Sequence, residues 1–163
     1  MNFYKGGVII FKEMRRKDRE IFNEDIEHIL VNGEYGTLST ICDNGYPYSV
    51  PLSYVYCNKS IYFHCAEDGY KLQNIQQNDK VSFCVVTDTE VLPSKFSTKY
   101  RSVIVFGTAS IVTGDLKETI LIHLIDKYSH DFLEEGKKYV EKAKDNTKIM
   151  EIHIKHMTGK SRI

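Results

Sequence analysis

Residues 48–71 (YSVPLSYVYCNKSIYFHCAEDGYK) constrain the fold of this chain more than any other segment. They contain two strand-like runs separated by Asn58-Lys59, a pair suited to a tight turn, so we expect two strands followed by a helix. In the first run, 48–56, larger apolar residues alternate with a face that carries Ser49, Pro51 and Ser53. Pro51 cannot donate a ladder hydrogen bond, which predicts a sheet edge or a bulge at this strand.

The rest of the chain adds further strands and helices around this hairpin. Strand-like runs occur at 35–42, 60–66, 80–87, 100–113 and 148–156. Apolar spacing and capping residues predict helices at 23–33, with Gly33 as a left-handed C-cap, and at 69–75, 114–128 and 132–144. Asp43-Asn44-Gly45 predicts a hairpin turn, and Gly107 predicts a bulge or bend. We expect a polar loop at 88–99 and a basic, flexible tail at 157–163.

Six strands with helices inserted among them, and no regular alternation of strand and helix, favour a mainly β fold. We expect a six-stranded antiparallel barrel with helices packed at its ends, and a doubly wound α/β sheet is the alternative. The 163 residues suit one domain, residues 14–163, preceded by a flexible leader at 1–13.

Charge and cysteine content exclude several classes of protein. Basic and acidic residues number 22 each, so the chain lacks the net positive charge of a nucleic-acid binder. Cys42, Cys57, Cys65 and Cys84 form no CxxC pair and follow no signal peptide, which indicates reduced thiols. No apolar run is long enough to span a membrane, so we expect a soluble, cytoplasmic protein.

Several familiar motifs fail on inspection. The run 158–161 (TGKS) matches only the end of a phosphate-binding loop, because Ile154 stands where the motif needs a glycine and no helix follows. In a regular strand His153 and His156 face opposite sides, so no metal site is expected. The chain contains neither G-x-S-x-G nor G-x-G-x-x-G.

Residues 48–71 also contain the groups best suited to ligand chemistry. The face of Ser49, Pro51 and Ser53 would let a flat ligand lie close to the backbone. His64 follows on the next strand, and Lys71 lies in the first turn of a helix whose free N–H groups suit an anion. Residue types alone leave open a simpler interpretation, in which the lysine is solvated and the histidine belongs to the core.

The sequence resembles the 5-nitroimidazole-resistance proteins of the pyridoxamine 5'-phosphate oxidase-like, FMN-binding split-barrel superfamily. The resemblance covers residues 14–162 and is carried by the order and spacing of short segments. These are MRRKDRE at 14–20, YSVPL at 48–52, YFH at 62–64, GYK at 69–71 and HMTGK at 156–160.

This resemblance implies a split-barrel homodimer with FMN in clefts between the subunits. It implies that Ser49, Val50, Pro51, Leu52 and Ser53 lie against the flavin, with His64 beside it as the catalytic residue. Lys71 and nearby amides would hold the phosphate, and Cys65 stands where the superfamily often has Ser or Thr. Tyr100 and Ser102 would approach the partner's flavin, and Gly159 and Lys160 match the terminal motif.

The activity implied is FMN-dependent reduction of nitroaromatic or similar small electrophilic acceptors, with His64 donating a proton or a hydrogen bond. One alternative is a non-catalytic protein that binds flavin, deazaflavin or haem, with His64 or His156 as axial ligand. Pyridoxamine phosphate oxidation is a third possibility, but no basic cluster is evident for a second phosphate.

Overall fold

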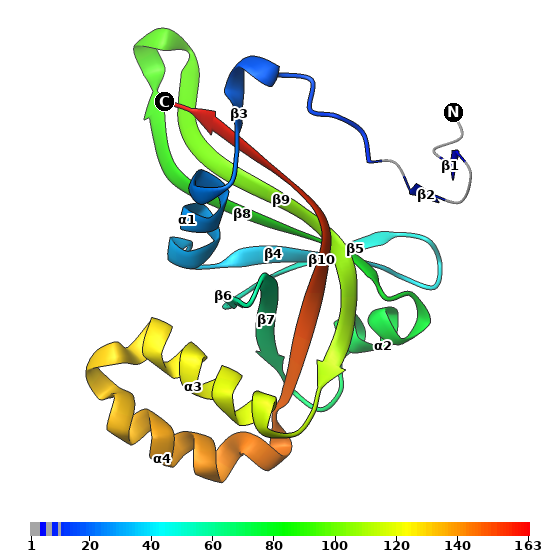
Figure 1. The fold of residues 1–163 in the computed structure, drawn as a ribbon, viewed down its shortest axis with the longest axis vertical. Helices are drawn as coiled ribbons and strands as arrows, with labels where there is room; N and C mark the ends of the chain where they lie inside the picture. The colour runs from blue at the N-terminus through cyan, green and yellow to red at the C-terminus, as the bar shows by residue number, and fades with distance from the viewer. Residues whose placement is uncertain (1–3, 6–7, 10) are drawn as a thin grey trace.

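A computed structural model describes residues 4–5, 8–9 and 11–163 of the chain (Figure 1). The other residues, 1–3, 6–7 and 10, fall within the predicted leader, so the expected flexibility of that segment lies largely outside the described residues. The strands are β1 (Tyr4–Lys5), β2 (Val8–Ile9), β3 (Glu20–Ile21), β4 (Gly36–Ile41), β5 (Pro47–Leu52), β6 (Val55–Cys57), β7 (Ser60–Cys65), β8 (Lys80–Leu92), β9 (Ser97–Val112) and β10 (Lys148–Arg162).

Strands β3 to β10 form one antiparallel sheet with the order β5-β4-β8-β9-β10-β7-β6, and β3 pairs with β10. The predicted antiparallel, mainly β architecture is therefore confirmed, although this sheet has eight strands instead of six. The doubly wound α/β alternative is wrong, because neighbouring strands in the sheet pair antiparallel.

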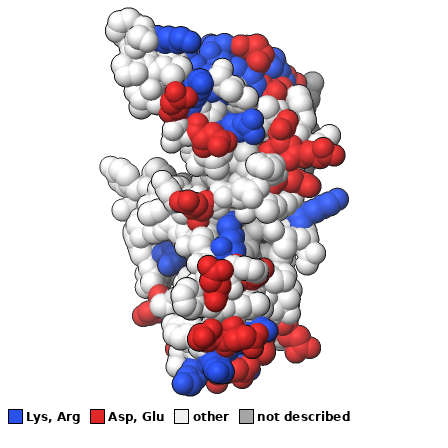
Figure 2. All heavy atoms as spheres, turned by 90° about the vertical axis from the view of Figure 1, so that its left-hand side faces the viewer, with Lys and Arg blue, Asp and Glu red and all other residues white. Residues whose placement is uncertain are grey.

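Four α-helices close the sheet: α1 (Glu24–Asn32), α2 (Tyr70–Gln77), α3 (Asp115–Ser129) and α4 (Leu133–Ala143). One core lies inside the curved sheet, where α1 and α2 contribute apolar residues to it. A second core lies between the sheet and the α3–α4 pair, which packs at one end of the molecule (Figure 1). On the face shown in Figure 2, acidic and basic side chains are interspersed, as the balanced composition leads one to expect.

The predicted strand 48–56 is broken between Leu52 and Val55. Its facing is nevertheless as predicted, since Val50, Leu52, Tyr54 and Tyr56 all contact the inner core. β5 pairs only with β4, whereas β6 pairs with β7 at the other end of the strand order. The expected edge position of Pro51 is confirmed. The same short run thus forms both edges of the sheet, which must wrap round on itself.

Two predicted irregular segments are strands, and Gly33 is not in the left-handed region. Residues 88–99 form a hairpin in which β8 and β9 extend as far as the turn at Pro93–Lys95. Residues 157–162 continue β10, because backbone pairing to β9 persists to Arg162. Gly33 has φ −61°, and the need for glycine is steric, since a Cβ there would lie 2.5 Å from Val85 Cγ1.

At Gly107, β9 and β10 leave no room for a side chain. Gly107 pairs with Ile154, and the register shifts between Ile154 and His156, so the predicted bend exists with its extra residue on β10. A Cβ at position 107 would lie 2.4 Å from the carbonyl oxygen of His153. The two longest strands can therefore bend together only around a residue that has no side chain.

Gly107→Ala should lower the free energy of unfolding by about 1–3 kcal/mol, because the added methyl group forces β9 and β10 apart. Urea unfolding followed by circular dichroism measures this effect. Ser110→Ala, at an exposed position on the same strand, is the control and should change stability by less than about 0.5 kcal/mol. Equal stability of Gly107→Ala and the parent protein would contradict the steric argument.

Candidate functional site

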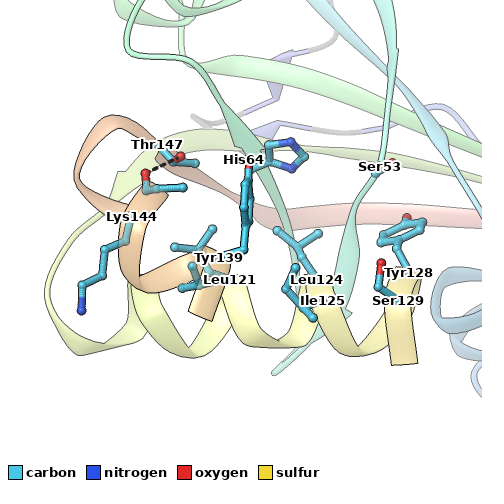
Figure 3. A pocket seen from close by; sticks show the side chains of 12 residues that line it. Ser53, His64, Leu121, Leu124, Ile125, Tyr128, Ser129, Tyr139, Lys144 and Thr147 are labelled. Atoms are coloured by element: carbon cyan, nitrogen blue, oxygen red, sulfur yellow. Dashed lines mark hydrogen bonds between the residues drawn. The ribbon is translucent and has the colours of Figure 1, made fainter. Parts of the chain in front are cut away.

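A cavity of about 220 Å³ lies between the sheet and the α3–α4 pair (Figure 3). His64 of β7 and Ser53, from the break between β5 and β6, line it on the sheet side. The helices and the segment that follows them supply Leu121, Leu124, Ile125, Tyr128, Ser129, Tyr139, Val140, Ala143, Lys144 and Thr147. The cavity is mainly apolar, and its polar groups are His64, Lys144 and the serine, threonine and tyrosine hydroxyls.

His64 lies on the outer face of β7, because its neighbours Phe63 and Cys65 point into the inner core. Partial burial lowers the pKa of its imidazole, and the positive charge of Lys71 lowers this pKa further. Both effects favour a neutral ring near pH 7. Such a ring can donate one N–H hydrogen bond but holds no extra proton.

Lys71 lies in the first turn of α2, half-buried and near both His64 and Cys65, whose pKa values its charge lowers. Gly69 caps this helix without a side-chain hydrogen bond and has φ 140°, and a Cβ there would meet no atom within 4 Å. The backbone at the start of α2 is therefore open beside a lysine. This arrangement suits an anionic group.

The small-residue strand face lies outward, as predicted. Ser49 and Pro51 are exposed on β5, and the Ser49 hydroxyl lies 2.8 Å from the hydroxyl of Ser39 on β4. Val50 and Leu52 turn inward and pack on the core, so only their backbone could touch a ligand on the outer face. Ser53 follows these residues and reaches the cavity.

Cys65 does not face this site. Its side chain is buried in the inner core, and burial raises the pKa of the thiol. The Cys65 thiol is therefore not placed where it could replace a phosphate-binding hydroxyl. Lys148, its partner on β10, instead donates a hydrogen bond of 2.5 Å to the carbonyl oxygen of Glu67.

Tyr100, Ser102, Gly159 and Lys160 form a second group, near the C-terminal end of β10. Lys160 pairs with Ser102, and its ammonium group donates a 2.5 Å hydrogen bond to the Tyr100 hydroxyl. Gly159 faces inward, where a Cβ would lie 2.5 Å from Ile26 Cγ1, so glycine is needed there for packing. Lys160 is eleven residues further along β10 than Ile149, the partner of His64. At about 3.3 Å per residue this separation is a path of roughly 35 Å along the strand.

His153 and His156 face the same side of β10, contrary to the sequence expectation. They pair with Thr108 and Phe106, which are two residues apart on β9, and the register shift between them restores the facing. The ring of His156 stacks on that of Phe11 with ring centroids 4.6 Å apart, and its buried Nε2 has no hydrogen-bond partner among the described residues. Within the described residues, no three His, Cys, Asp or Glu side chains group as a metal site requires.

Sequence reasoning did not find the residues that α3 and α4 contribute to the cavity. Tyr128 was expected only as the end of the helix predicted over 114–128, yet it lines the cavity and its hydroxyl bonds to the backbone of Tyr54, the residue after Ser53. Helical spacing cannot show which residues of a packed face border a void.

In the part of the chain that the structure describes, no helix is long and apolar enough to cross a membrane.

Comparison with known proteins identifies the family. The family model for pyridoxamine 5'-phosphate oxidase matches residues 23–161, which is most of the chain. The chain belongs to the pyridoxamine 5'-phosphate oxidase family. This assignment confirms the superfamily predicted from the sequence, and the wrapped, split sheet is the fold expected for it. No curated protein matches this family member.

Solved structures with low sequence identity share this family member's fold. A candidate 5-nitroimidazole antibiotic resistance protein of Bacteroides thetaiotaomicron is 21% identical, with TM-score 0.70 and coverage of 86% of this chain and 85% of that one. A conserved hypothetical protein of Mycobacterium tuberculosis is 19% identical, with TM-score 0.79 and coverage of 91% and 90%. An FAD- and heme-binding protein of Mycobacterium smegmatis is 19% identical, with TM-score 0.74 and coverage of 88% and 73%.

Lys71→Met should raise the pKa of His64, because it removes a positive charge that disfavours the imidazolium form. The pKa should stay below that of a free histidine, since burial is the larger cause of the shift. NMR titration of the imidazole signals measures it. Lys80→Met, an exposed substitution at the start of β8, is the control and should leave the pKa unchanged. A pKa that stays constant or falls in Lys71→Met would contradict the proximity of the two groups.

Proposed function

We propose that this protein is an FMN-dependent oxidoreductase that reduces nitroaromatic or similar small electrophilic acceptors. The observation that carries this proposal is the position of His64 and Ser53 at an apolar cavity, next to an outward strand face of small residues and the open start of α2. Flavin binding is supported by family membership and by solved neighbours named for FAD binding. The resistance protein among the neighbours supports the acceptor class.

The size of the cavity indicates that it would hold the acceptor and not the cofactor. At about 220 Å³ it is smaller than the roughly 300–1,000 Å³ of sites for drug-sized ligands, and so too small for a three-ring flavin with its phosphate. A single-ring acceptor suits it better. The flavin ring would lie outside, against Ser49 to Ser53, with its phosphate at Lys71 and the start of α2.

Reduced FMN would supply two electrons as a hydride. Reduction of a nitro group to a nitroso group takes one hydride and one proton and releases water. In this scheme the neutral His64 donates an N–H hydrogen bond to a nitro oxygen, and the proton comes from water. The leucine and isoleucine side chains of the helices would hold the acceptor's ring.

Pyridoxamine phosphate itself is a poorer substrate for this cavity. Among the described residues that line it, Lys144 alone carries a fixed positive charge. The Lys144 ammonium group lies 3.1 Å from a Glu118 carboxylate oxygen and 3.0 Å from one of Glu141. A substrate phosphate would have to compete with both carboxylates.

We also propose that the site is completed by a second copy of the chain. Tyr100, Ser102 and Lys160 cannot reach the His64 region of their own subunit, because β10 separates the two groups along its length. The outer face of β4, β8 and β9 beside them exposes apolar side chains, notably Ile104 at 42% and Phe106 at 38%. Packing of this face on its counterpart would bring each group close to the other subunit's site.

A binding protein without turnover is the second candidate. One solved neighbour is named for binding both FAD and heme, and His64 is an exposed imidazole with a lowered pKa that could ligate iron. His156 suits this role less well, because Phe11 covers its ring. The absorption spectrum distinguishes the two candidates, since haem gives a Soret band.

The purified protein should be yellow, or should bind added FMN, and its reduced form should be reoxidised anaerobically by 2-methyl-5-nitroimidazole. His64→Ala should keep the flavin but lose turnover by roughly 100-fold, because the hydrogen bond to the acceptor is gone. His123→Ala, an exposed substitution on α3, is the control and should keep its activity. A colourless protein without affinity for FMN would falsify the proposal.

Ile104→Asp should convert the dimer to a monomer and weaken FMN binding, because it places a charge in the apolar outer face. Light scattering after size-exclusion chromatography measures the mass, and fluorescence titration measures the affinity for FMN. Phe132→Asp alters a more exposed aromatic residue in the turn between α3 and α4 and should remain dimeric. A parent protein that is monomeric with FMN bound would rule out a shared site.

A further inference from the structure

A hydroxyl group from α3 bonds to the backbone at the break between β5 and β6. The Tyr128 hydroxyl accepts a 2.9 Å hydrogen bond from the backbone N–H of Tyr54. Its own hydrogen faces two carbonyl oxygens, that of Glu34 at 2.7 Å and that of Tyr54 at 3.0 Å. One side chain thus satisfies backbone groups at the break and in the segment that leads into β4.

The neighbouring contacts keep this arrangement in place. The Tyr54 ring is fully buried and meets Phe83 edge-on, with ring centroids 5.0 Å apart. Lys127, also on α3, places its ammonium group 4.0 Å from the centroid of the Tyr54 ring. Two adjacent residues of α3 therefore contact Tyr54, one at its backbone and one at its ring.

The Tyr128 hydroxyl also lies next to Ser53, because it bonds to the backbone of the following residue, Tyr54. Burial raises the pKa of Tyr128, whereas its bond to the Tyr54 backbone and its contact with the Ser53 side chain lower it. Ser53 and Tyr128 both line the cavity, and Figure 3 shows both residues at the same end of it. The hydroxyl thus binds the backbone beside Ser53, the residue that joins the strand face to the cavity.

We propose that Tyr128 is a positioning residue, whose hydroxyl holds the β5–β6 break so that Ser53 is directed at the acceptor. This inference rests on the proposed function, because it takes the cavity as the acceptor site. In this arrangement Ser53 contacts the acceptor, and Tyr128 fixes the position of Ser53. The phosphate region at Lys71 is on a different element and does not depend on this hydroxyl.

The test is a double-mutant cycle with reduced holoprotein and 2-methyl-5-nitroimidazole as the probe. Tyr128→Phe keeps the ring, and with it the cavity wall, and should raise KM roughly threefold to tenfold, the effect of one lost hydrogen bond, with kcat changed little. Ser53→Ala should raise KM similarly. The double variant should be no worse than either single variant, since Tyr128 acts through Ser53.

Tyr62→Phe is the matched control. It removes the hydroxyl of a tyrosine that packs in the same helical core and donates a 3.1 Å hydrogen bond to Glu151, and Tyr62 does not line the cavity. Its KM should equal that of the parent protein. A rise in KM for Tyr62→Phe equal to that for Tyr128→Phe would mean that loss of stability explains both, and the inference would fail.

A second measurement separates this inference from the proposed function. Hydrogen exchange of the Tyr54 amide needs neither flavin nor acceptor, and it should be at least tenfold faster in Tyr128→Phe than in the parent protein. Unchanged exchange, or additive effects of the two substitutions on KM, would overturn the positioning role while leaving flavin chemistry intact. If the protein instead binds no flavin, the function fails and the exchange result still decides whether Tyr128 holds the break.

Discussion

The break at Ser53–Tyr54 is the constraint on which the rest of this structure depends. A run of eleven residues, from Pro47 to Cys57, forms one edge of the sheet, crosses a two-residue gap and forms the other edge. Because two residues cannot span a flat sheet of this order, the strands between must curve until the edges meet. The curvature is taken up where β9 and β10 bend together at Gly107, and the inner core fills the enclosed space.

The location of the candidate site follows from that closure. At the break the chain leaves one edge and joins the other, so Ser53 makes no ladder bond there and is free to border a cavity. β7, next to β6, brings His64 to the same place, and α3 packs across both. The remaining site residues lie far along β10, which is why a complete site requires a second chain in our proposal. Folding of one chain thus builds half of the site, and association with a second chain would supply the other half.

Much of the local structure could be predicted from the sequence. The alternation of Val50, Leu52, Tyr54 and Tyr56 toward the core, the turns at Gly45 and at Asn58-Lys59, and the edge position of Pro51 all follow from side-chain chemistry near each residue. Residues 88–99 and 157–162 were mistaken for loop and tail because their polar side chains resemble those of loops. Their strand character comes from pairing with β9, which no local pattern shows.

The sequence by itself determined which residues could carry chemistry, because hydroxyl, imidazole and ammonium groups are properties of single residues, and their order along the chain sufficed to indicate the family. Only the tertiary structure decided which of them meet. It buried Cys65 in the core, turned Gly159 toward Ile26, stacked His156 on Phe11, and brought Tyr128 to Tyr54, 74 residues away in the chain. Such contacts depend on the curvature of the sheet and on the packing of α3, which are set by the whole chain at once.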